Sequence, residues 1–286
     1  MIPRLLESPD PAIRRLAGDP HADVMTSRRV RTLLDFPDVH PYRKWYGAHW
    51  RIVELADLGV PPGTPEVEPG VERVLTWLVS PRRRFTTVNG LVRRCASQEG
   101  NALYACSRLG YASDPRAGKL AAWLLEWQWP DGGWNCDVKA SGRRSSFHET
   151  VTPALGLAAY HEATGDPGAL AAARRSGELF LEHRLFRSLA DGEVIHRSWT
   201  QPHYPPYWHY DVLQGLRLLD VLGLITDVRA GEAIELLEHS RGADGRFSGP
   251  AWWSSKRPAA VDWGRGPENE MLNLRVEAIL QAGRRR

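Results

Sequence analysis

Residues 155–181 read LGLAAYHEATG followed by DPGALAAARRSGELFL, and this stretch predicts two helices joined by a sharp turn. Gly165 stands just past the first apolar segment, where glycine is favoured because it adopts the left-handed backbone that ends many helices. Asp166 and Pro167 mark the start of the second helix, since aspartate caps free amides and proline suits the first turn. The stretch is therefore expected to form a helical hairpin.

The same signal recurs along the chain, which indicates a repeat protein. The turn glycines are Gly59, Gly110, Gly165 and Gly223, at steps of 51, 55 and 58 residues. Asp-Gly turns follow the second helix of a pair and begin at Asp131, Asp191 and Asp244. The repeating unit is therefore helix, glycine turn, helix, Asp-Gly turn and a long polar loop, and we count about five units.

The two helices of a unit differ in polarity. Residues 210–222 and 151–159 are apolar on nearly every side, so the first helices of these units should be enclosed. The second helices carry charged faces, such as the one with Glu232 and Glu235, and should lie outside.

The fold that this pattern predicts is all-α: an α/α toroid, a closed ring of about five helical hairpins with inner and outer helices. The ring should span residues 42–286, after an N-terminal helical arm at residues 1–41. An open solenoid, as in other helix-pair repeats, and a compact bundle are the alternatives. We favour the ring because the segments ahead of the inner helices are too polar and too aromatic for solvated linkers.

Composition narrows the class of protein. Of the 286 residues, 42% are hydrophobic and 25% are charged, which is typical of a globular chain. No apolar run approaches the ~18 residues of a transmembrane segment, and the start MIPRLLESPDPAIRRL lacks the apolar stretch of a secretory signal. Three cysteines are too few for a disulfide scaffold. We therefore expect a cytoplasmic protein.

Nucleic acid is not an expected partner. The net charge of +3 arises from 37 basic and 34 acidic residues, and the densest basic patch, Arg82–Arg84 with Arg93 and Arg94, is typical of a solvated face. The chain has no glycine-rich phosphate loop, no dinucleotide fingerprint and no Gly-x-Ser-x-Gly elbow. The partner that we expect is a small-molecule substrate.

Titratable residues stand ahead of the inner helices, where the loops of a ring meet at one mouth of its cavity. These positions carry Glu99, His148 with Glu149, and His209 with Asp211. Helix capping is the alternative role for each carboxylate. Histidine is a poor cap, so we predict that His148 and His209 form an acid/base pair. Glu149 and Asp211 would orient or charge them, which makes these four the candidate catalytic residues.

Tryptophan is unusually frequent, with 12 Trp against 6 Phe. Aromatic faces can line a cavity for an apolar chain or steady a positive charge, although packing between helices is the alternative. The candidate substrate-binding residues at the mouth are Glu99, Trp134, Trp208, Tyr210 and Trp263.

A metal site is a further possibility at the same mouth. Cys136, His148 and His209 would supply one thiolate and two imidazoles, a partial zinc shell, with Asp137 or Cys95 as a fourth group. No short Cys-x-x-Cys or His-Glu-x-x-His spacing accompanies them. This zinc expectation therefore depends on the ring.

Residues 128–134 read Gln-Trp-Pro-Asp-Gly-Gly-Trp and resemble the QW repeat of squalene-hopene cyclases and related class II terpene cyclases. From about residue 42 onward, the wider pattern resembles the prenyltransferase and squalene-cyclase superfamily of α/α toroids. The corresponding segments at Asp191 and Asp244 lack the Gln and Trp of the motif. In terpene cyclases these repeats tie helices together, so the resemblance implies the fold more than the chemistry.

The functional residues of the superfamily match only in part. Class II cyclases protonate their substrate with an Asp-x-Asp-Asp motif, which this chain lacks, and Asp211 is its nearest positional match. Protein prenyltransferase β-subunits bind zinc through Asp, Cys and His. Residues 147–150 resemble the segment that carries their histidine, but residues 99–101 read Glu-Gly-Asn where their Asp and Cys should stand.

The resulting expectation is an enzyme that resembles terpene cyclases and prenyltransferases and acts on an isoprenoid or other apolar small molecule by acid/base chemistry. A zinc-dependent transferase or hydrolase is the alternative enzyme. A non-catalytic toroid that binds a glycan or peptide against its aromatic side chains is the alternative from another class.

Overall fold

The computed structural model describes residues 3–81, 85–254 and 256–284, and this part of the chain is mostly helical. The α-helices are α1 (Pro11–Ala17), α2 (Arg28–Leu34), α3 (Ala48–Asp57), α4 (Glu68–Leu78), α5 (Ser97–Arg108), α6 (Pro115–Trp127), α7 (Phe147–Thr164), α8 (Pro167–Glu182), α9 (Val212–Val221), α10 (Gly231–His239) and α11 (Glu270–Gly283). The all-α prediction is confirmed. The basic run Arg82–Arg84 lies outside the described residues.

Short 3-10 helices and one β-hairpin complete the described structure. The 3-10 helices are η1 (Pro3–Glu7), η2 (Val24–Thr26), η3 (Pro65–Val67), η4 (Arg197–Thr200), η5 (Val228–Ala230) and η6 (Gly266–Glu268). Strands β1 (Thr86–Val88) and β2 (Leu91–Arg93) pair antiparallel, with Thr86 opposite Arg93. No described helix has both the length and the apolarity that a membrane crossing requires.

The glycine turns form where the sequence predicts them. α7 ends at Gly165, whose φ of +77° is left-handed, and the Asp166 side chain accepts a hydrogen bond of 2.9 Å from the Ala169 N–H at the start of α8. Gly59, Gly110 and Gly223 also have positive φ, between 70° and 92°. Hairpin boundaries thus follow from local backbone chemistry.

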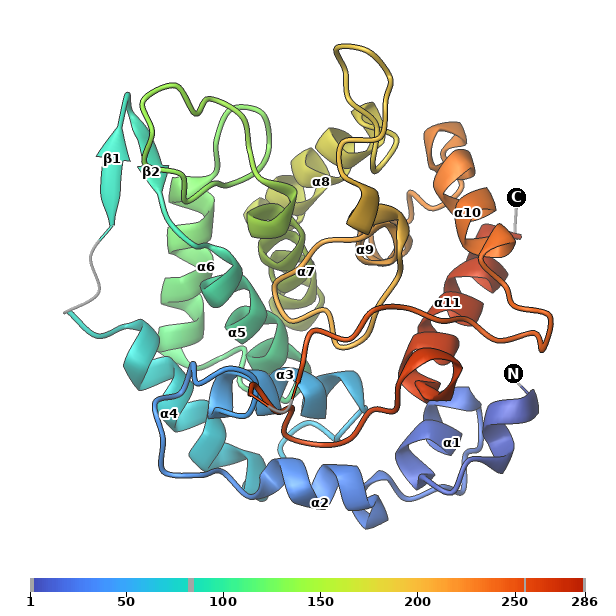
Figure 1. The fold of residues 1–286 in the computed structure, drawn as a ribbon. Coiled ribbons are helices and arrows are strands. Elements are labelled where there is room, and N and C mark those ends of the chain that lie inside the picture. The colour runs from blue at the N-terminus through green and yellow to red at the C-terminus, as the bar shows by residue number, and fades with distance from the viewer. Residues whose placement is uncertain (1–2, 82–84, 255, 285–286) are drawn as a thin grey trace.

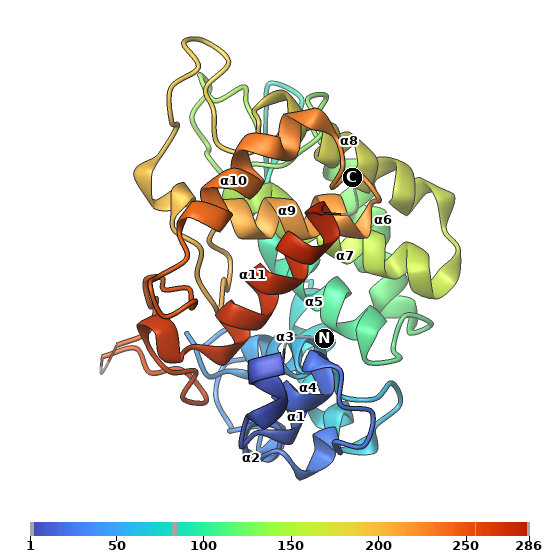
Figure 2. The same ribbon diagram turned by 90° about the vertical axis from the view of Figure 1, so that its right-hand side faces the viewer.

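The helices lie in two layers (Figure 1). α3, α5, α7, α9 and α11 contact one another in succession, while α4, α6, α8 and α10 pack on their outer side. The N-terminal helices stand between the two ends of this succession, because α1 contacts α11 and α2 contacts α3. Figure 2, turned by 90°, shows α11 on the near side of the molecule, with α10 above it and α1 below it.

The closest packing joins α5 to α7. A Cβ atom added to Gly100 would lie 2.3 Å from the Pro153 nitrogen, and one added to Gly156 would lie 2.5 Å from the Gly100 carbonyl oxygen. Only glycine permits backbones to approach this closely. This contact brings the first turns of α5 and α7 together, and the candidate site lies there.

Candidate functional site

Three segments that are distant in sequence meet where α5 and α7 begin. The Ser97 N–H donates to Glu149 Oε2 at 3.0 Å, and the Tyr210 N–H donates to His148 Nδ1 at 2.8 Å. His148 and Glu149 lie in the first turn of α7. The loops before α5, α7 and α9 are therefore neighbours in space.

A thiol–carboxylate cluster, formed by Cys95, Cys136 and Glu149, lies at this meeting point. Their Sγ and carboxylate atoms all lie within 4.8 Å of one another, and Cys136 Sγ is 3.7 Å from Glu149 Oε1. Within residues 3–81, 85–254 and 256–284, no other His, Cys, Asp and Glu side chains form a group of three or more suited to a metal ion. These three residues are the ones that could hold a metal.

The pKa values of all three groups in the cluster are shifted from their ordinary values. Burial raises the pKa of Glu149, and hydrogen bonds from Ser97 and Cys136 only partly offset this effect. The hydrogen bond between the two thiols lowers the pKa of Cys95 and raises that of Cys136. Cys95 is thus the more acidic of the two thiols, and both lie beside a buried carboxyl group.

Backbone hydrogen bonds hold the two thiols side by side. Arg93 forms a parallel bridge with Asn135, and the Arg94 N–H donates to the Asn135 carbonyl at 3.1 Å. The Asn135 side chain donates to the Arg144 carbonyl at 2.9 Å, which closes the loop that leads to α7. The loop is therefore tied at both sides, and Cys136 is held opposite Cys95.

Glu99, a candidate substrate-binding residue, is buried beside the cluster. Its Oε1 accepts two hydrogen bonds from Arg94, one of them from Nε at 3.0 Å. Glu99 thus forms an ion pair with a residue of its own segment.

The two predicted histidines lie near each other, with ring centroids 6.3 Å apart. His209 lies between two indoles in a His–Trp stack, 4.0 Å from Trp208 and 3.6 Å from Trp252 between centroids. Desolvation, followed by the nearby His203 and His148, lowers the pKa of His209 to about 3. Desolvation also lowers the pKa of His148 to about 4. Both rings are neutral at pH 7 and are weak bases there.

Asp211 takes the capping role that the sequence left open. Its Oδ1 accepts a hydrogen bond of 3.1 Å from the Gln214 N–H in the first turn of α9. Its Oδ2 accepts from the His203 N–H at 3.0 Å and lies 2.5 Å from His203 Nδ1. Asp211 thus orients His203, a buried histidine that the sequence did not single out.

The candidate aromatic residues occupy different environments. Trp134 and Tyr210 are buried and donate to the carbonyls of Leu124 and Leu185, at 3.0 and 2.6 Å. Trp263 is also buried. Trp208 is half-buried, and the amino group of Lys44 lies 5.1 Å from its ring centroid. Trp208 is therefore the candidate that a ligand at the surface can reach.

The zinc ligands expected from sequence are separated in the structure. Cys136 joins Cys95, the alternative fourth group, and Glu149. Neither His148 nor His209 belongs to a metal-ligating group among the described side chains. Cys95 and Glu149 were each visible in the sequence, but their convergence depends on the backbone bridge between two loops.

A small cavity lies between α3, α5, α7 and α9. Its volume is about 20 Å³, and Asp57, Tyr104 and Arg217 are among the residues that line it. This volume holds about one water molecule. This cavity is too small for a ligand the size of an isoprenoid.

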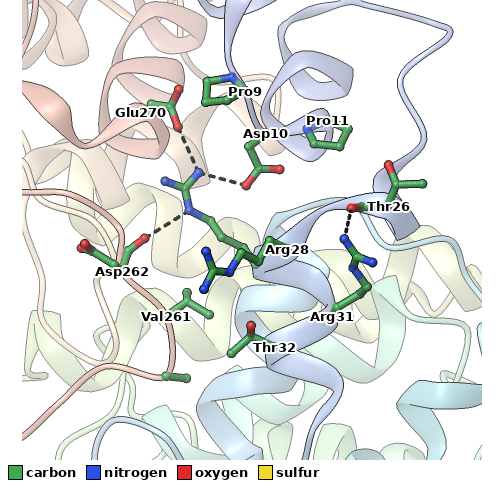
Figure 3. A pocket seen from close by; sticks show the side chains of 12 residues that line it. Pro9, Asp10, Pro11, Thr26, Arg28, Arg31, Thr32, Val261, Asp262 and Glu270 are labelled. Atoms are coloured by element: carbon green, nitrogen blue, oxygen red, sulfur yellow. Dashed lines mark hydrogen bonds and ion pairs between the residues drawn. The ribbon is translucent and has the colours of Figure 1, made fainter.

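A larger pocket, of about 800 Å³, lies away from these residues, between α1, α2 and the segment before α11 (Figure 3). Arg29 lines this pocket and donates to Asp10 and Glu270, at 3.0 Å each, and to the Asp262 carbonyl at 3.1 Å. None of the predicted site residues lines it. The ion pairs of Arg29 with Asp10 and Glu270 join α2 to the start of α1 and to α11, so this pocket lies at a structural contact between these helices.

Comparison with protein-family models, curated proteins and solved structures finds no match for this chain.

Proposed function

We propose that this chain is an enzyme that acts on an apolar small molecule, with its reaction centre at the thiol–carboxylate cluster. The observation that carries the proposal is the convergence of Cys95, Cys136 and Glu149 from three separate segments. Helix packing does not require two thiols and a buried carboxyl group at one place, and such groups gather preferentially at functional sites.

The fold that we propose for the enzyme is the closed α/α toroid. The succession of contacts from α3 to α11, with α1 and α2 between its ends, supports a ring. Residues 128–134, which resemble a QW repeat, tie helices as such repeats do, because Gln128 Nε2 donates to the carbonyls of Gly132 and Ala172 at 2.9 Å each.

The chemistry that we propose is proton transfer at the cluster. The hydrogen bond between the two thiols lowers the pKa of Cys95, so Cys95 acts as base or nucleophile, and the Glu149 carboxylate, which lies within 4.8 Å, accepts the proton that Cys95 releases. His148 stands beside Glu149, and its ring centroid lies 5.6 Å from that of Trp208. An apolar substrate would rest on the exposed edge of the His–Trp stack while it meets the cluster.

A non-catalytic binding module is the second candidate. The parallel rings of the His–Trp stack favour it, since stacked aromatic faces also bind sugars and peptides. Such a module would bind its ligand with the same affinity in wild-type protein and in a variant that lacks Glu149.

Substitution of Glu149 by Gln tests the enzyme. The purified chain is incubated with a panel of isoprenoids and other apolar small molecules, and products are followed by mass spectrometry. Loss of the proton acceptor should lower the rate by at least about 100-fold. The matched control is Glu162→Gln on the same helix, an exposed residue that pairs with Arg108 at 2.9 Å, and it should keep the wild-type rate. Equal rates in both variants, or no product from wild-type protein, would overturn the proposal.

A further inference from the structure

We infer that Cys95, Cys136 and Glu149 bind one zinc ion, with a fourth position open to water or substrate. The binding does not depend on the proposed function, but any role of the metal in turnover does. The ligand set is two thiolates and one carboxylate, which differs from the Asp, Cys and His that the prenyltransferase resemblance implies. It also leaves out both predicted histidines.

The spacing of the ligand atoms suits zinc. Zn–S bonds of ~2.3 Å and Zn–O bonds of ~2.1 Å at a tetrahedral angle place a sulfur and an oxygen about 3.6 Å apart. The observed separation between Cys136 Sγ and Glu149 Oε1 is 3.7 Å. The third ligand atom, Cys95 Sγ, lies within 4.8 Å of the other two, so small side-chain rotations complete the shell.

The carboxylate is oriented for binding through one oxygen. Oε2 of Glu149 accepts the hydrogen bond from the Ser97 N–H at 3.0 Å, which leaves Oε1 facing the thiols. Outer hydrogen bonds of this kind fix the direction of a metal ligand and strengthen binding.

Backbone hydrogen bonds hold the frame around the ligands in place. The Arg94 N–H to Asn135 carbonyl bond, at 3.1 Å, sets the two thiols opposite each other, and the Ser146 N–H donates to the Trp134 carbonyl at 2.8 Å. Glu149 stands in the first turn of a long buried helix. Ligands on such a frame lose little conformational freedom when they bind.

The ligand types select the metal. Thiolates favour zinc and other soft divalent ions over Mg²⁺ and Ca²⁺, which require oxygen ligands. Three protein ligands are the number found in catalytic zinc sites, whereas structural sites have four. A site of this composition would take up Zn²⁺ and, in its place, Co²⁺.

Metal titration of the full chain tests the inference. Protein treated with a chelator and a reductant is titrated with ZnCl₂ by calorimetry, and bound zinc is measured by mass spectrometry after dialysis. One zinc per chain is expected. Titration with CoCl₂ should produce the near-ultraviolet charge-transfer band of thiolate-bound cobalt, which reports on the wild-type protein without any substitution.

Variants assign the ligands. The double variant Cys95→Ser, Cys136→Ser should lose stoichiometric zinc and the cobalt band, and Glu149→Ala should weaken zinc binding by at least about 10-fold. Cys106→Ala removes a buried thiol of α5 outside the cluster and should bind as wild type does. Wild-type protein without zinc or cobalt binding, or a double variant that binds both, overturns the inference. Zinc binding without turnover would count against the proposed enzyme and leave the metal site standing.

Discussion

At the scale of the residue, His209 makes stability depend on pH. Its pKa of about 3 in the folded chain lies below the ordinary value of 6.5, so the unfolded chain binds a proton between these values and the folded chain does not. Stability should therefore fall as pH drops from 6.5 towards 3, by about 1.4 kcal/mol per pH unit for this one group. The groups that face the ring are His203, His148 and Lys44, all of which lower its pKa further.

Substitution of His209 by Phe checks this dependence. Phenylalanine keeps a flat ring between Trp208 and Trp252 but cannot take a proton. Urea unfolding at pH 7 and at pH 4.5 should show that the variant loses about 2.5 kcal/mol less than wild type over this interval, because the dependence sets in only below the ordinary pKa of 6.5. The same change at His239, an exposed residue in the last turn of α10, should leave the dependence as in wild type. An unchanged slope in His209→Phe would contradict the assigned pKa.

Single residues were predictable from sequence where their role is local. Asp166 caps the helix that follows it, as its residue type and position predict, and Asp211 caps α9, which was the alternative to its predicted catalytic role. The partners of Glu149 were not predictable, because Cys95 and Cys136 reach it through a bridge between loops about 40 residues apart in sequence. A helix cap depends on residues that are neighbours in sequence and can be predicted from them. A contact between distant loops leaves no comparable pattern in a single sequence.

At the scale of the element, the contact between α5 and α7 depends on glycine. Ala in place of Gly usually stabilises a helix by about 1 kcal/mol. At Gly156 the added Cβ would lie 2.5 Å from the Gly100 carbonyl oxygen, so the two backbones would have to separate. We expect Gly156→Ala to lower the free energy of unfolding by about 1–3 kcal/mol.

Gly118 in α6 supplies the matched control. A Cβ there would meet only the Tyr160 hydroxyl, at an ordinary distance of 3.5 Å. Gly118→Ala should therefore stabilise the chain by up to about 1 kcal/mol. Chemical denaturation measures both changes, and stabilisation by Gly156→Ala would refute the close approach.

The elements show which patterns predict structure. Glycine turns and Asp-Pro starts predicted the helical hairpins, since each acts within one turn of backbone. The β-hairpin of β1 and β2 was not predicted, although Asn89 and Gly90 mark it. Both have positive φ, 52° and 75°, as the tight turn between two strands requires.

At the scale of the whole molecule, Asp57 joins four inner helices. Its Oδ1 lies 2.6 Å from Arg275 of α11 and 3.3 Å from Arg217 of α9, and it accepts a hydrogen bond of 2.9 Å from Tyr104 of α5. Burial raises the pKa of Asp57, but the arginines and the tyrosine hydroxyls outweigh this effect and lower it. Its contribution to stability is therefore present above the ordinary pKa of about 3.9 and is lost as pH falls below it.

Loss of that charge should weaken the whole assembly of inner helices. Asp57→Asn leaves Arg217 and Arg275 without their anion, so the free energy of unfolding should fall by about 3 kcal/mol at pH 7. Glu178→Gln, which removes an exposed pair with Arg229, should cost less than about 1 kcal/mol. Urea unfolding compares the two, and equal losses would show that Asp57 does not hold the helices together.

This network also concerns how closely the inner helices pack. The sequence indicates which helices face inward but not how closely they approach. The ion pairs of Asp57 with Arg217 and Arg275 draw their helices together, and Asp57 and Arg217 line the small cavity between them. Distances of this kind depend on closure of the whole chain.

The contact of α1 and α2 with α11 bears on how the protein matures during translation. Ser8 donates to Glu270 at 2.7 Å across 262 residues of sequence, and Arg29 binds the same carboxylate. α1 therefore emerges from the ribosome long before its partner is synthesised. Until then the part of its apolar face that packs on α11 stays uncovered, so this segment of the nascent chain is open to association with other chains or with a chaperone.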